Sequence, residues 1–129
     1  MMRKVVFMLM ALLLVTGMAT AQEKKAVIAV ENATHDFGKI NESDGSVSHT
    51  FVVTNKGDAP LVITRVVASC GCTTPIWTKE PIAPGKTGKI DITFNPLNRP
   101  GAFSKTISVY SNGKVGSFIL SIRGEVIGK

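Results

Sequence analysis

The clearest pattern along the chain is an alternation of apolar and polar residues with a period of two. Between Lys89 and Phe94, the apolar residues Ile90, Ile92 and Phe94 fall on one face and polar residues fall on the other. Successive side chains of a β-strand point to opposite sides, so this segment predicts a strand with one buried face. After residue 21, no segment keeps apolar residues at helical spacing for three turns. The pattern therefore predicts an all-β protein.

Other segments of the same kind bring the predicted total to about seven strands. In the last of them, Phe118, Leu120 and Ile122 share one face. The predicted strands, besides 89–94, span residues 26–31, 47–55, 61–68, 73–79, 103–110 and 115–125.

Turn-forming residues separate these segments at short intervals. Gly permits positive φ and Pro fixes its own φ, so both favour turns. Asn112-Gly113 lies between the last two predicted strands and predicts a two-residue type I′ hairpin. Antiparallel sheets that are apolar on one side bury those sides against each other. The predicted fold is an immunoglobulin-like β-sandwich of about seven antiparallel strands.

The N-terminal residues predict a secretory signal peptide at 1–21. Arg3 and Lys4 form its charged region, residues 5–15 its apolar region, and Ala19-Thr20-Ala21 a small-residue cleavage site. The apolar run is shorter than the roughly 20 residues that span a bilayer. We therefore expect one domain at 22–129, exported to the periplasm or the extracellular space, with no transmembrane anchor after cleavage.

Charge and composition argue against several function classes. The formal net charge is +6, of which Arg3 and Lys4 belong to the predicted signal. The remaining basic residues form no run and have no interleaved aromatic residues, so we expect no nucleic-acid partner. All five methionines lie between Met1 and Met18, which leaves none in the domain to complete a copper thioether site.

Several motifs follow one another in an order that resembles a known family. From about Thr34 to Val126, the chain resembles a bacterial exported family of unknown function, related to the Ig-like domains of the Hydin and major-sperm-protein group. The resemblance implies an Ig-like sandwich and leaves the biochemical role unassigned; related domains are protein-interaction modules. The motifs include Phe37-Gly38-Lys39-Ile40, Pro60-Leu61-Val62-Ile63, Pro81-Ile82-Ala83-Pro84-Gly85 and, as the most specific, Ser69-Cys70-Gly71-Cys72-Thr73.

Cys70 and Cys72 are the only cysteines, and they are the candidate disulfide or thiol site. Two residues of extended chain span up to roughly 7 Å, which is at or beyond the limit for a disulfide, so a bond requires a local bend at Gly71. Three states remain open: a local disulfide, two reduced thiols that pack, or a metal or redox site. A redox pair more usually has two intervening residues and opens a helix, neither of which occurs here.

Thiolates are soft ligands that suit copper(I) or zinc, but the chain offers few further ligands. A structural zinc site needs four ligands, and the candidates besides the cysteines are His35 and His49, which the sequence pattern leaves isolated from each other. His49 shares a face with Phe51, which favours a packed histidine. We therefore expect no cofactor.

Trp77 and Tyr110 are single residues of their types and candidate interface residues, although packing in the core or at its rim is the alternative. Trp77 follows the cysteine motif closely and is expected to cover it. Neither a Gly-x-Ser-x-Gly nor a His-Glu-x-x-His motif occurs, so we expect no enzyme activity.

The sequence thus predicts an exported protein-interaction or scaffolding module whose partner is an unidentified envelope or extracellular protein. Binding would use the end loops or a strand added to an exposed sheet edge. The alternative is a thiol, disulfide or soft-metal protein built on Cys70-Gly71-Cys72. The oligomeric state does not follow from the sequence.

Overall fold

A computed structural model describes residues 24–128. The predicted signal peptide, residues 1–21, lies outside this range. Between residues 24 and 128, no helix is long and apolar enough to cross a membrane. This part of the chain forms one short 3-10 helix, Glu42–Asp44, and the strands β1 (Ile28–Val30), β2 (Thr34–Asn41), β3 (Val47–Asn55), β4 (Ile63–Ala68), β5 (Thr73–Trp77), β6 (Thr87–Phe94), β7 (Gly101–Ser111) and β8 (Ser117–Ile127).

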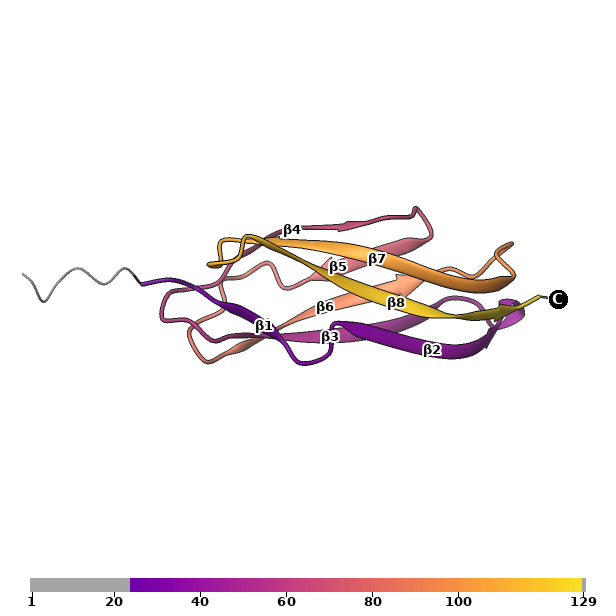
Figure 1. Ribbon diagram of the computed structural model, residues 1–129, viewed down its shortest axis with the longest axis horizontal. Helices are drawn as coiled ribbons and strands as arrows, with labels where there is room; N and C mark the ends of the chain where they lie inside the picture. The colour runs from indigo at the N-terminus through magenta and orange to yellow at the C-terminus, as the bar shows by residue number, and fades with distance from the viewer. Residues whose placement is uncertain (1–23, 129) are drawn as a thin grey trace, which may run out of the picture.

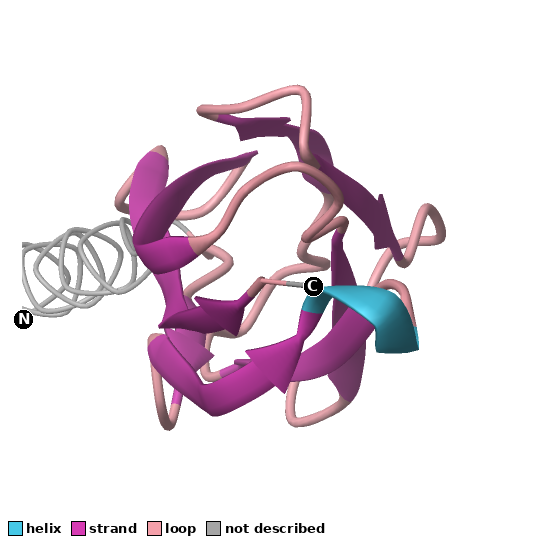
Figure 2. Ribbon diagram, turned by 90° about the vertical axis from the view of Figure 1, so that its right-hand side faces the viewer, coloured by secondary structure: helices cyan, strands magenta, loops and turns pink. Residues whose placement is uncertain are grey.

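The strands form two four-stranded sheets that pack face to face. One sheet has the order β1-β3-β6-β5 and the other the order β2-β8-β7-β4. The strands run along the long axis of the molecule (Figure 1), and a view down that axis shows them enclosing an interior (Figure 2). This arrangement confirms the predicted β-sandwich.

The strand that the sequence pattern missed is β2. Its alternation breaks at Gly38, where φ is 68° and the register against β8 shifts between Asp36 and Lys39. The Asp36 carboxylate accepts a hydrogen bond from the Gly38 N–H (2.7 Å), which fixes this bulge. As a result, Phe37 and Ile40 both pack on the core although they are three residues apart.

The pairing of β2 with β8 also corrects the prediction that all strands are antiparallel. Residues 31–33 carry the chain from β1 in one sheet to β2 in the other without reversing its direction (Figure 1). The strand β2 therefore meets β8 in the parallel sense, with Thr34 opposite Ser121 and Asn41 opposite Ile127. The remaining strand pairs in the described range are antiparallel.

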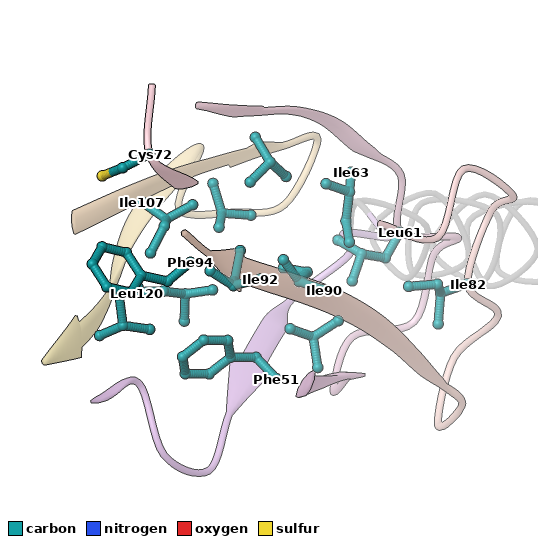
Figure 3. Packing of buried hydrophobic residues seen from close by; sticks show 14 of the residues in the cluster. Phe51, Leu61, Ile63, Cys72, Ile82, Ile90, Ile92, Phe94, Ile107 and Leu120 are labelled. Carbon is teal, nitrogen blue, oxygen red and sulfur yellow. The ribbon is translucent and has the colours of Figure 1, made fainter. Parts of the chain in front are cut away.

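The core lies between the sheets and uses the predicted alternating positions. Ile90, Ile92 and Phe94 of β6 are fully buried, as are Leu120 and Ile122 of β8. Figure 3 shows the cluster running from Cys72 at one end to Ile82 at the other. Burial of these apolar side chains is the main driving force for association of the two sheets.

The last two strands form the predicted hairpin, but its turn is not the predicted type I′. Neither Asn112 nor Gly113 has positive φ, and the hairpin closes with a hydrogen bond from the Ser111 N–H to the Gly116 oxygen (3.0 Å). The Asn112 side chain instead accepts from the Val62 N–H (2.8 Å) and donates to the Pro60 oxygen (3.1 Å). Tertiary hydrogen bonds therefore override the local turn preference.

Candidate interaction groove

The cysteine turn connects edge strands of opposite sheets. The structure links Cys70 and Cys72 by a disulfide, with their Cα atoms 5.1 Å apart, and the Thr73 N–H closes the turn on the Cys70 oxygen (3.2 Å). Cys72 is buried in the core and its oxygen accepts from the Asn95 N–H (2.9 Å). The turn thus joins the end of β4 to the start of β5 at one side of the sandwich.

The disulfide bears on the thiol and metal alternative. A thiolate is the form that binds soft metals and attacks disulfides, and neither sulfur is a thiolate while the bond is intact. Within residues 24–128, no group of three or more His, Cys, Asp and Glu side chains is placed to hold a metal ion. The structure therefore adds no observation that favours this alternative.

The structure does not bring Trp77 and Tyr110 together. Trp77 packs on the core from the sheet that contains β5, and the Lys79 ammonium lies 3.2 Å from its ring centroid. Tyr110 alternates with the buried Val109 on β7 of the other sheet and carries the Arg65 guanidinium 4.3 Å above its ring. The two rings therefore do not form one surface.

The prediction that Trp77 covers the cysteine turn is wrong. Trp77 pairs with Ile90 and Thr73 pairs with Phe94, so Trp77 lies at the opposite end of β5 from the turn.

His35 and His49 are not isolated from each other. Their rings stack across the two sheets with centroids 3.6 Å apart, and Phe37 and Phe51 meet them edge-on. Burial lowers the pKa of His49, and the neighbouring His35 lowers it further. The sequence pattern correctly placed His49 beside Phe51. It did not predict the contact with His35, because the strand β2, which carries His35, was not predicted.

An apolar groove of about 340 Å³ lies between β1 and the first half of β8. Val115 and Ile119 reach it from the β8 side and remain 66% and 52% exposed. Such exposure of neighbouring large apolar side chains is a common mark of a binding surface. The residues that line the groove are Ile28, Val30 and Ala33 on the β1 side and Val115, Phe118 and Ile119 on the β8 side.

The groove coincides with an open stretch of sheet edge. The strand β8 pairs with β7 from Ser117 to Val126, but β2 pairs with β8 only from Ser121 onward. Ser117–Leu120 therefore has no strand on its outer side within the described part of the chain. The Ser121 N–H already donates to the Ala33 oxygen (2.8 Å), and N–H groups two residues apart on a strand point the same way. The N–H of Ile119 consequently faces the groove.

Sequence reasoning missed the groove, although one signal was present. Phe118, Ile119 and Leu120 are three consecutive apolar residues in a segment that otherwise alternates. Phe118 packs partly on the core and Leu120 is fully buried, so Ile119 is the apolar residue on the outer face. The break in alternation therefore marks the residue of this run that adds an exposed apolar side chain to the groove.

A family model described as a protein of unknown function, DUF1573, matches residues 28–126. No curated protein sequence matches the chain. The family match agrees with the expected resemblance to an unknown-function family. The importance of the Ser69–Thr73 motif for that family and the export of the chain stay predictions.

Solved structures show the same fold at low sequence identity. A protein of unknown function from Porphyromonas gingivalis W83 superposes with a TM-score of 0.69 at 16% identity, over 83% of this chain and 50% of that one. The ASH/PapD-like domain 7 of human CEP192 gives 0.65 at 10% identity, over 86% and 92%. The VesB protease of Vibrio cholerae gives 0.60 at 16% identity, over 77% and 31%. The chain thus spans half of the first protein and under a third of the protease, and these likenesses support an Ig-like β-sandwich fold.

Proposed function

Since the chain belongs to the DUF1573 family, whose function is unknown, we propose its function from its own surface: it is a protein-binding module that accepts an extended apolar segment of a partner beside β8. The observation that carries this proposal is the coincidence of the open edge at Ser117–Leu120 with the apolar groove. With the predicted signal at 1–21, the proposed partner is a protein of the cell envelope or the extracellular space.

An added strand fits both the backbone and the side chains of this surface. Unpaired N–H and C=O groups on a sheet edge form a template for another strand, and alternate side chains of that strand then point to one face. About four residues of edge are free, which corresponds to roughly 13 Å of extended chain. The apolar face of the incoming strand would cover Val115 and Ile119, and its backbone would pair with Ile119.

The test uses a short peptide of alternating Thr and Val, acetylated and amidated so that it carries no charge. Nuclear magnetic resonance titration of the purified protein is expected to shift the backbone amides of Ser117–Leu120 and Ile28–Val30. The matched control peptide has Pro at its central positions, because Pro cannot donate to a sheet edge. Shifts that are absent, or that fall on β4 and β5 instead, would overturn the proposal.

A variant pair tests the groove side chains. Ile119→Lys is expected to weaken peptide binding by roughly tenfold, because the peptide must then desolvate an ammonium group. Val67→Lys is the control, since Val67 is a similarly exposed apolar residue on β4. Equal affinities of the two variants would contradict a role for the groove.

A further inference from the structure

Three lysines gather at one end of this groove. Lys25, Lys56 and Lys114 line an open pocket of about 520 Å³. Lys114 directly precedes Val115 on one side of the groove, and Val27, also in the pocket, directly precedes β1 on the other side. The pocket and the groove therefore adjoin.

Backbone hydrogen bonds fix the position of this end. The Lys56 N–H donates to the Val27 oxygen (2.7 Å), and the Lys114 N–H donates to the Ala26 oxygen (2.9 Å). The segment before β1 is thus held between the loop after β3 and the β7–β8 hairpin. Lys56 and Lys114 are both exposed. Their ammonium groups are presented to solvent from a fixed backbone.

The charge at this end of the groove is positive. Asp58 is the acidic residue among those lining the pocket, and its carboxylate accepts a hydrogen bond from the Lys25 backbone N–H (2.7 Å). One carboxylate therefore stands against the exposed ammonium groups of Lys56 and Lys114. The groove lining itself is apolar throughout. The groove and the pocket together form an apolar surface with a positively charged end. This surface favours a ligand that has an apolar stretch with negative charge beside it.

We infer that the partner segment carries acidic residues directly beside its apolar stretch, and that Lys56 and Lys114 bind them. This inference rests on the proposed function, because it names the chemistry of the strand that fills the groove. Exposed ion pairs add little affinity each, but charge complementarity fixes the register of a strand and excludes wrong partners. Register matters here because a slip by one residue would turn the apolar face of the partner strand away from the groove.

The experiment compares three peptides on the purified protein: the neutral Thr/Val peptide, the same peptide with three Glu added before it, and the same with three Glu added after it. At low ionic strength, one acidic peptide is expected to bind roughly fivefold more tightly than the neutral peptide, and that peptide also reveals the direction of the strand. The gain should shrink at about 0.5 M salt, where screening acts within a few ångströms.

Variants of the lysines test whether the pocket causes the gain in affinity of the acidic peptide. In the variant Lys56→Gln with Lys114→Gln, the neutral peptide should bind as before and the acidic gain should vanish. The control variant, Lys39→Gln with Lys89→Gln, removes the same charge from β2 and β6 and should keep the gain. If neither acidic peptide binds more tightly, or if the gain survives in the Lys56 and Lys114 variant, the inference fails while the proposed function stands. If the neutral peptide does not bind at the groove, the proposed function itself fails.

Discussion

Asn55 shows how a single buried polar side chain can hold several loops together. It is fully buried, and its amide donates to the oxygens of Ala59 (2.7 Å) and Ile82 (2.9 Å). Its side-chain oxygen accepts from the N–H groups of Gly57 (2.9 Å) and Val27 (3.3 Å). These loops cannot form regular strand pairs, so the side chain satisfies backbone groups that would otherwise be buried without partners.

Replacing this residue should therefore be costly. Asn55→Ala is expected to lower the free energy of unfolding by about 3 kcal/mol, because it leaves several buried donors and acceptors unpaired. Chemical denaturation measures the change, with the exposed Asn32→Ala as a control that should stay within about 0.5 kcal/mol of the parent. Equal stabilities of the two variants would show that the hydrogen bonds of the Asn55 side chain do not stabilise the fold.

The stacked histidines predict a pH dependence of stability. Because the pKa of His49 lies below its ordinary value of 6.5 in the folded protein, the unfolded chain binds more protons as the pH falls through that value. The free energy of unfolding should therefore decrease from pH 6.5 down to the lower pKa of the folded state, and level off below it.

A histidine variant separates this effect from other titrations. His35→Gln removes both a charge and a covering ring, so the pKa of His49 should move up toward 6.5 and the loss of stability in acid should be smaller. Nuclear magnetic resonance titration of the imidazole signals checks this directly, since the chain has only two histidines. A His49 that titrates at or above 6.5 in the parent protein would refute the argument.

At the scale of elements, the cysteine turn is a short crossover between edge strands, and its disulfide closes a very small loop. Such a loop restricts the unfolded chain little, so Cys70→Ala with Cys72→Ala is expected to cost only about 2 kcal/mol and to keep the fold. Thermal unfolding with and without a reductant measures this cost, and reduction of the parent should reproduce most of it. Loss of the folded state on reduction would contradict this prediction, because the fold would then depend on the disulfide.

The elements also show how far local patterns can predict structure. The alternating positions of β3, β6 and β8 point into the core as the sequence indicates. The strand β2 was missed because the bulge at Gly38 breaks its period, and the Asn112-Gly113 turn was misassigned because Asn112 bonds to Pro60 and Val62. The first error arises from a local irregularity that interrupts the period of two, and the second from a distant segment that determines the backbone of the turn.

For the whole molecule, the order of strands predicts where the fold opens first. The strands β3, β6, β7 and β8 have partners on both sides, whereas β1, β2, β4 and β5 are at edges. Native-state hydrogen exchange should therefore be slowest in the central strands, and the amide of Ile119 should exchange faster than that of Leu120. Uniform protection along β8 would contradict the open edge that we assign to its first residues.

The sequence by itself determined the all-β class, the sandwich and most of the buried face of each strand, because these follow from a period of two that acts along the local chain. It did not determine the stacking of His35 on His49, the parallel pairing of β2, or the groove beside Ile119. Each of these depends on which segments, distant in the sequence, meet within a sheet or between the sheets. That choice is made by packing of the whole core, and it is therefore visible only in the tertiary structure.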